Sequence, residues 1–145
     1  MKLLVQRVSK ASVEVENQII ASINEGVLVF VGFDKKDNSE NIGALANKLL
    51  EYKIFNDSQN KIALSLNETN NDILIVPQVT LSVGTKKGTK PSFSEAAEPK
   101  KGNQLFEDFK KLLSTKFKPI QSGKFGAEMS VSLINEGPIT FWFEL

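Results

Sequence analysis

The stretch Gly26-Val27-Leu28-Val29-Phe30-Val31-Gly32-Phe33 contains only apolar residues and glycine. Successive side chains of a β-strand point to opposite faces of the sheet. A strand that is apolar on both faces has to be covered on both faces, which is typical of a central strand. This stretch therefore predicts the middle of a sheet that is packed on both sides.

Further strands are predicted on both sides of this central segment. Residues 2–9 and 11–16 precede it, and the second of these runs alternates with a period of two. Residues 18–23 predict a short third strand that ends at a turn signal. Later apolar runs predict the remaining strands, with a proline between the first two: residues 73–76, 78–83, 120–123, 129–134 and 139–144.

Two amphipathic helices are predicted between the strands. The first has an apolar stripe at helical spacing, and Asp37 or Ser39 is expected to cap it. The second spans about residues 102–117. The apolar faces consist of Ile42, Leu45, Ala46, Leu49 and Leu50, and of Leu105, Phe106, Phe109, Leu112 and Leu113. Without repeats or linkers, residues 1–145 predict a single α+β domain, rich in sheet, with two main helices as a covering layer.

The composition excludes several kinds of chemistry. The chain has no cysteine and no histidine, which removes disulfides, thiolate catalysis and the Ser-His-Asp and Cys-His nucleophile systems. It also removes the commonest ligands of transition metals, and we expect neither a metal nor a cofactor. The N-terminus does not read as a signal peptide, and no apolar run approaches the ~20 residues of a membrane span. We therefore expect a cytoplasmic protein without a membrane partner.

The charge is unevenly distributed along the chain. The net charge is +1, but residues 86–124 hold ten lysines against four acidic residues, or +6. These are Lys86, Lys87, Lys90, Lys100, Lys101, Lys110, Lys111, Lys116, Lys118 and Lys124. A polyanionic partner would account for this bias. The alternative is a solvated helix face with additional loop lysines.

The hexapeptide Asn135-Glu136-Gly137-Pro138-Ile139-Thr140 interrupts two apolar runs. Proline fixes φ and lacks an N–H, glycine adopts almost any φ, and an X-Pro bond can be cis at modest cost. The sequence therefore predicts a rigid, specially shaped piece of backbone where a plain hairpin turn would have sufficed. The alternative is a bulge or a strand start, with a trans bond before Pro138 and no partner contact.

The tetrapeptide Pro77-Gln78-Val79-Thr80 is the second candidate site. On a strand, the amide of Gln78 and the hydroxyl of Thr80 would lie on the same side. Together they could orient a polar substrate while nearby N–H groups stabilise an oxyanion. The alternative is again a bulge or turn without chemistry.

Short motifs in a fixed order extend this pattern over the whole chain: Val5-Gln6-Arg7-Val8, Ala11-Ser12-Val13, Lys53-Ile54-Phe55, Pro77 to Leu81, Lys87 to Phe93, Ala96-Ala97, Gly123 to Ala127 and Asn135 to Thr140. With these motifs the chain resembles the D-aminoacyl-tRNA deacylases of bacteria and eukaryotes. Enzymes of that family hydrolyse the ester that joins a D-amino acid, or glycine, to the terminal adenosine of tRNA.

The resemblance implies a barrel-like fold, a homodimer, aminoacylated tRNA as the partner, and catalysis largely by backbone groups and the 2′-hydroxyl of the tRNA. It implies that Gly137-Pro138 is cis and reaches into the pocket of the other subunit. There its carbonyls would accept the amino group, and its bulk would exclude the side chain of an L-amino acid. Arg7 matches the arginine that supports this loop, and Phe125 and Met129 lie in the matching substrate-side segment.

The pocket motif of the family usually reads Ser-Gln-Phe-Thr, and this chain departs from it at two positions. Pro77 lacks the hydroxyl and the N–H of serine, and Val79 lacks a ring that could pack near the terminal adenine. The N–H of Val79 remains as an oxyanion donor. The predicted catalytic set is therefore Gln78, Val79 and Thr80, with Pro77 among the substrate-binding residues.

Two other functions compete with deacylation. A catalytically weak or silent dimer that binds tRNA or other RNA would keep the fold after the two substitutions. A dimeric structural protein without a role in RNA binding would scatter its lysines over the surface instead of gathering them beside the Gly-Pro loop.

Overall fold

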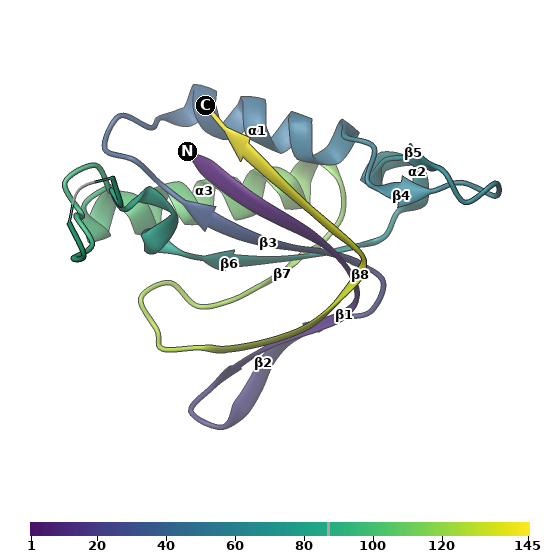
Figure 1. Ribbon diagram of the computed structural model, residues 1–145, viewed down its shortest axis with the longest axis horizontal. Helices are drawn as coiled ribbons and strands as arrows, with labels where there is room; N and C mark the ends of the chain where they lie inside the picture. Colours follow the sequence, from purple (N-terminus) through teal and green to yellow (C-terminus); the bar gives the residue numbers. More distant parts are fainter. Residues whose placement is uncertain (87) are drawn as a thin grey trace.

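A curved sheet of six strands forms the centre of the molecule in the computed structural model, which describes residues 1–86 and 88–145 (Figure 1). The strands are β1 (Lys2–Val15), β2 (Gln18–Ile23), β3 (Gly26–Gly32), β6 (Asp72–Pro77), β7 (Gln121–Ser122) and β8 (Ser130–Glu144). The order is β2-β1-β3-β6-β7, and β8 pairs with the other side of β1. The β3–β6 and β6–β7 pairs are parallel, and all pairs of β1 are antiparallel.

Strand β1 gives the sheet its barrel-like curvature. Its first half pairs with β3 and its second half with β2, while β8 accompanies it on the other side from Lys2 to Glu14. The prediction of separate strands at residues 2–9 and 11–16 is therefore wrong, because pairing with β8 keeps the strand continuous. The runs at 129–134 and 139–144 likewise belong to the one strand β8.

The central strand β3 is covered on both faces, as its sequence predicts. Val27, Val29 and Val31 belong to the larger core beneath the helices. Leu28 is buried in a second core on the inner side of the curved sheet, and Phe30 packs against it. The apolar side chains of β6 also alternate between the two cores: Ile73 and Ile75 belong to the larger core, and Leu74 and Val76 to the second.

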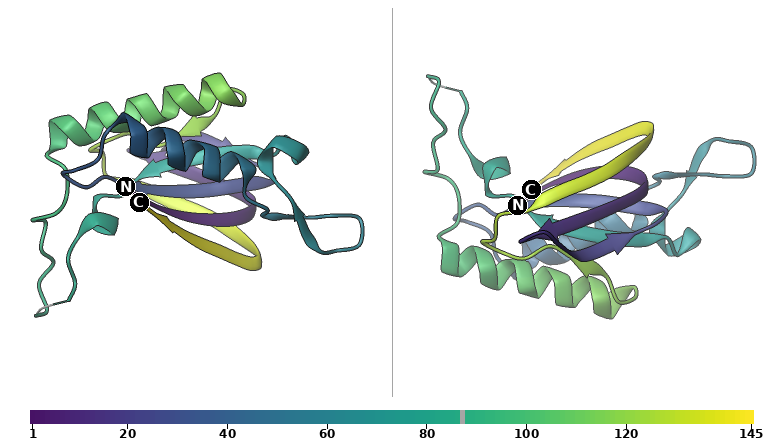
Figure 2. Two further views of the ribbon diagram at one scale, coloured as in Figure 1. Left: turned by 90° about the horizontal axis from the view of Figure 1, so that it is seen from above. Right: turned by 90° about the horizontal axis from the view of Figure 1, so that it is seen from below.

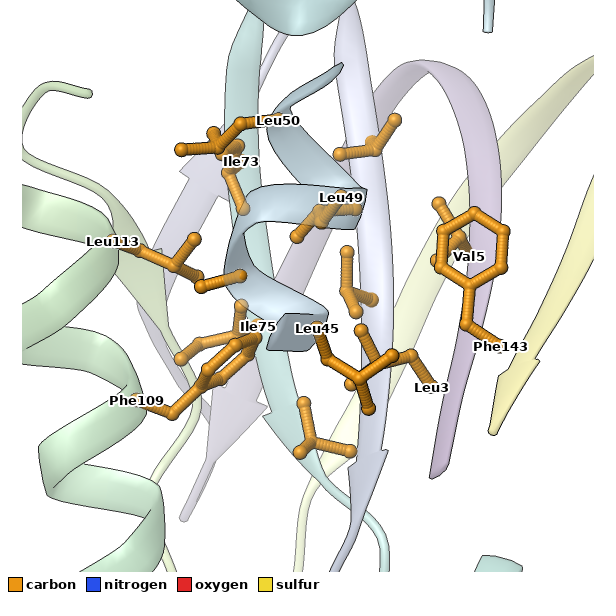
Figure 3. Packing of buried hydrophobic residues seen from close by; sticks show 14 of the residues in the cluster. Leu3, Val5, Leu45, Leu49, Leu50, Ile73, Ile75, Phe109, Leu113 and Phe143 are labelled. Carbon is orange, nitrogen blue, oxygen red and sulfur yellow. The ribbon is translucent and has the colours of Figure 1, made fainter. Parts of the chain in front are cut away.

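Helices α1 (Ser39–Glu51) and α3 (Pro99–Lys116) pack against each other on one face of the sheet (Figure 2). Their apolar stripes fill the space above the strands, with Leu45 and Leu49 of α1 and Phe109 of α3 pointing toward the sheet (Figure 3). Helix α3 begins earlier than predicted, because Pro99 is tolerated in a first turn that needs no N–H. The described helices contain no segment with the length and hydropathy that a membrane crossing requires.

Asn38 caps helix α1, so the predicted caps Asp37 and Ser39 are wrong. The Asn38 side chain accepts hydrogen bonds from the N–H groups of Glu40 and Asn41. Asp37 is buried instead, and its carboxylate accepts from the N-terminal ammonium of Met1 at 2.5 Å and from the N–H of Asp34 at 2.6 Å. A buried carboxylate with these two donors is not available to cap a helix.

Smaller elements connect the main ones. Strands β4 (Phe55–Asn56) and β5 (Ile62–Leu64) form a separate hairpin, followed by the short helix α2 (Leu66–Thr69). A 3₁₀ turn, η1 (Val79–Ser82), follows β6. The predicted strand at residues 78–83 is wrong: the N–H of Gln78 donates the last hydrogen bond to β3, at the carbonyl oxygen of Val31, and the chain then turns into η1.

Candidate functional site

A pocket of about 480 Å³ lies at the carboxyl end of β6, against the start of α3 and the loop between β7 and β8. Its lining is mainly apolar: Val76, Pro77, Gln78, Val79, Ala97, Pro99, Phe125, Gly126, Ala127, Met129 and Val131. Five of the residues predicted for the site are therefore gathered from two distant parts of the sequence. They are Pro77, Gln78, Val79, Phe125 and Met129.

Two glycines allow the β7–β8 loop to form one wall of this pocket. A Cβ on Gly123 would stand 2.8 Å from the sulfur of Met129, which also accepts a hydrogen bond from the N–H of Lys124. The ring of Phe125 lies over Gly102 of α3 and close to Phe106, with 6.1 Å between the two ring centroids. The wall is therefore attached to the buried core of the molecule.

Gln78 and Thr80 are paired, although not on the strand that was predicted. The side-chain amide of Gln78 donates to the hydroxyl oxygen of Thr80 across the start of η1. Thr80 is exposed beside the pocket, and its hydroxyl hydrogen is free to donate to a ligand. Because the chain has no histidine and the described hydrogen-bond partner of the Thr80 hydroxyl is the amide of Gln78, the hydroxyl can orient a substrate but has no base to activate it.

The start of η1 also offers a backbone donor. The N–H of Val79 belongs to the first residue of a 3₁₀ turn, and such an N–H has no acceptor within its own turn. Val79 lines the pocket and is about half exposed. A pocket with an amide, a hydroxyl and a backbone N–H can bind and polarise a carbonyl group.

The Gly137-Pro138 bond is cis, as predicted, and it forms an exposed bend in β8. Arg7 donates from Nε to the carbonyl oxygen of Glu136 at 3.1 Å, directly before the Gly137-Pro138 step. Gly137 has a φ of +128°, and a Cβ there would stand 2.7 Å from Ile139 Cγ1 and 3.0 Å from Arg7 Nη2. Only glycine fits this position without strain.

The side chain of Asn135 closes the base of this bend. Its Oδ1 accepts from the N–H of Ile139 at 3.0 Å, and its Nδ2 donates to the hydroxyl of Thr140 at 2.9 Å. Sequence reasoning did not assign Asn135 a role. The signal that could have found it is its place just before a Gly-Pro step, since asparagine side chains commonly bond to nearby backbone at turns.

The bend in β8 lies at the opposite end of the sheet from the carboxyl end of β6, where the pocket is found (Figure 1). Asn135, Val8, Gly26 and Asp72 form one row across the sheet, whereas Pro77 is five residues further along β6. At about 3.3 Å per residue, this separates the two features by roughly 16 Å along the strands alone. The chain therefore does not bring Gly137, Pro138 and Arg7 to its own pocket.

Two of the predicted lysines flank the pocket, whereas Lys118 lies at the other end of the sheet, where it pairs with Asp72. Lys100 follows Pro99 of the pocket rim, and Lys124 precedes Phe125 and lines an adjoining polar groove. Five of the ten lysines lie on α3. Among the described lysines of this group, Lys110 forms an ion pair with Glu107, and Lys118, just beyond α3, forms one with Asp72. Lys87 lies outside the described residues. In the described parts of the chain, no acidic cluster has the size needed to hold a metal ion.

The similarity to known proteins extends over nearly the whole chain. The family model described as D-Tyr-tRNA(Tyr) deacylase matches residues 4–144. A D-aminoacyl-tRNA deacylase of Teredinibacter turnerae is 46% identical over 144 residues, 99% of each chain. One of Haemophilus influenzae is 43% identical over 145 residues, which is all of both chains.

Solved structures agree with the fold. The structure titled c-Myc DNA Unwinding Element Binding Protein superposes with a TM-score of 0.96 at 34% identity, covering 100% of this chain and 99% of that one. A probable eukaryotic D-amino acid tRNA deacylase superposes with a TM-score of 0.85 at 23% identity, covering 99% and 98%. By the family model and these relatives, the chain belongs to the D-aminoacyl-tRNA deacylase family.

Proposed function

We propose that this protein hydrolyses the ester bond between a D-amino acid, or glycine, and the terminal adenosine of tRNA. The observation that carries the proposal is the pocket in which Gln78 and Val79 meet Phe125 and Met129, with Thr80 held beside it by Gln78. An apolar pocket with a few convergent polar groups is what a nucleoside ester requires. The full-length similarity to deacylases supports the same reaction.

In this proposal the protein positions and polarises the ester rather than attacking it. The Gln78–Thr80 pair orients the substrate, and the N–H of Val79 stabilises the oxyanion that develops when water attacks the ester carbonyl. The resemblance assigns further assistance to the 2′-hydroxyl of the tRNA. This division of roles suits a pocket that has no acidic or imidazole side chain in its lining.

We further propose that the Gly137-Pro138 bend of one subunit completes the pocket of the other. The bend is exposed and held by Arg7, but it lies far from the pocket of its own chain. A second copy with two-fold symmetry would present its bend to this pocket and receive the first bend in return. Rejection of L-amino acids would then come from backbone that cannot yield to an extra side chain.

The surface of β8 supports the association of two chains. Among the described residues β8 pairs with β1 alone, so its other edge is unpaired. Ile134 and Trp142 of this strand are about half exposed. Exposed apolar side chains on an open strand edge are typical of a surface that a partner covers.

The lysines at the pocket end fit the phosphates of the tRNA acceptor arm. Lys100 and Lys124 flank the pocket, and no carboxylate among the described residues lies within ion-pair distance of either. A silent RNA-binding dimer would use the same lysines, so binding alone does not separate the two functions. Hydrolysis of D-tyrosyl-tRNA and glycyl-tRNA by the purified protein tests the proposal. Release of the amino acid supports deacylation, whereas tRNA binding without release contradicts it and favours the silent dimer.

A further inference from the structure

Asn56 contacts Arg7 on the side opposite to the Gly137-Pro138 bend. Arg7 Nη1 donates to Asn56 Oδ1 at 3.0 Å and to the carbonyl oxygen of Ile54 at 3.0 Å. Its Nε donates to the carbonyl oxygen of Glu136, directly before Gly137. The planar guanidinium therefore joins the β4–β5 hairpin to the bend in β8 through one rigid group.

The orientation of the Asn56 amide follows from the chemistry of its neighbours. Arginine has only donors, so the atom that faces it has to be the amide oxygen. The amide nitrogen then points away and donates to Asn60 Oδ1 at 2.7 Å. The hydrogen bond to Asn60 therefore fixes the Asn56 amide with its oxygen toward Arg7.

Asn60 is itself held by a rigid turn. It has a φ of +61°, and asparagine tolerates this left-handed conformation better than most residues. Asp57 Oδ1 accepts hydrogen bonds from the N–H groups of Gln59 and Lys61, and the carbonyl oxygen of Asp57 accepts from the N–H of Asn60. The turn thus fixes the end of a series of contacts that leads through Asn56 and Arg7 to Glu136.

We propose that Asn56 is a positioning residue that sets the placement of the Gly137-Pro138 bend through Arg7, and thereby the discrimination between D- and L-aminoacyl esters. This inference rests on the proposed function, in which the bend excludes the L side chain. A wall that discriminates by overlap has to stand within a fraction of an ångström of its place. Without Asn56, Arg7 keeps its hydrogen bonds to the carbonyl oxygens of Ile54 and Glu136 but loses the third contact that holds its guanidinium against the β4–β5 hairpin.

The test compares the ratio of kcat/KM for L-tyrosyl-tRNA to that for D-tyrosyl-tRNA in three variants. We expect Asn56→Ala to raise this ratio about tenfold, the effect of losing one hydrogen bond to a charged group. Asn56→Asp keeps an acceptor for Arg7, and Asn60 can turn its amide to donate to it, so we expect the wild-type ratio. The control Asn38→Ala removes the cap of α1, far from the bend, and lowers stability without changing the ratio.

Each outcome decides between a positioning role and a structural one. A wild-type ratio in Asn56→Ala would overturn the inference while the proposed function stands. An equal change of the ratio in Asn56→Ala and Asn38→Ala would also overturn it, because the change would follow from lost stability. If the wild-type protein does not hydrolyse D-tyrosyl-tRNA, the proposed function fails and this inference fails with it.

Discussion

The ring of Phe125 lies directly over Gly102, where an added Cβ would stand 3.1 Å from the ring carbon Cζ. This contact connects the wall of the candidate pocket with helix α3. Gly43 in α1 offers a matched comparison, because a Cβ there would meet nothing within 4 Å. Alanine at either position removes the cost of a helical glycine, which is about 0.5–1 kcal/mol.

The two glycines therefore predict different results for the same substitution. Gly43→Ala should raise the free energy of unfolding by about 0.5–1 kcal/mol and leave deacylation unchanged. Gly102→Ala should gain less stability and lower kcat/KM severalfold, because Phe125 has to move into the pocket. Thermal unfolding and D-tyrosyl-tRNA hydrolysis measure both effects. Equal activity in the two variants would show that Phe125 is not a functional wall.

Thr80 is expected to position the substrate rather than to act as a nucleophile. Thr80→Ala should reduce deacylation by about tenfold, the effect of one lost hydrogen bond to a developing charge, and leave measurable turnover. Thr80→Ser retains the hydroxyl that Gln78 contacts and should keep most of the activity. Complete loss in Thr80→Ala, together with an acylated Thr80 trapped by rapid quenching, would establish a nucleophile instead.

Asp34 gives a prediction for stability in acid. Burial alone would raise the pKa of its carboxyl, but the hydrogen bond and charge of Lys2 lower the pKa below its usual value of 3.8. A group whose pKa is lower in the folded state stabilises the protein above the unfolded-state pKa, and this contribution disappears as the pH falls through the folded-state pKa. The Lys2–Asp34 pair therefore stabilises the fold at neutral pH and weakens below about pH 4.

We expect Asp34→Asn to lower the free energy of unfolding at pH 7 by about 1–3 kcal/mol. Below pH 4 the stabilities of wild type and variant should converge. Lys53 and Ser65 lower the pKa of Glu68 to about 2. Glu68 therefore also loses its stabilising effect in acid, but equally in the wild type and in Asp34→Asn, so it does not affect the difference between them. Denaturant unfolding as a function of pH measures this difference, and a gap that is constant with pH would contradict the assignment.

The proposed exchange of bends requires a dimer. Light scattering at micromolar concentration should give twice the chain mass of 16.0 kDa. A monomer under these conditions would remove the cross-subunit mechanism, because the bend cannot reach the pocket of its own chain.

The hydrophobic pattern of the sequence predicts which face of each strand or helix is buried. The two apolar faces of β3 and the stripe of α1 are confirmed, because hydrophobic periodicity reports directly which side of an element is covered. The pattern does not predict where a strand begins and ends, because this depends on the strands with which it pairs. Whether residues 2–16 form one strand depends on β8, which lies more than a hundred residues away in the sequence.

The candidate site was likewise predicted only in part. The family motifs pointed to five residues that line the pocket and to Arg7, which contacts the bend, but not to the 3₁₀ turn that carries Thr80. Asn56 and Asn135 were missed because their roles depend on hydrogen bonds with specific distant or looped partners. Single polar residues carry no periodic signal, so their partners appear only once the chain is folded.

A mixed dimer tests most directly whether the bend of one subunit completes the pocket of the other. One chain would carry Gln78→Ala and Thr80→Ala, and a differently tagged chain would carry Gly137→Ala, which clashes with Ile139 and Arg7. Each variant alone should hydrolyse D-tyrosyl-tRNA poorly, the first because its pocket lacks the Gln78–Thr80 pair, and the second because its displaced bend no longer presents the carbonyls that would accept the amino group. The co-purified mixed dimer contains one pocket and one bend that are both intact, on different chains. We predict that it recovers about half of the wild-type activity, as one of two symmetric sites. A mixed dimer no more active than the two variant proteins would contradict a site shared between subunits.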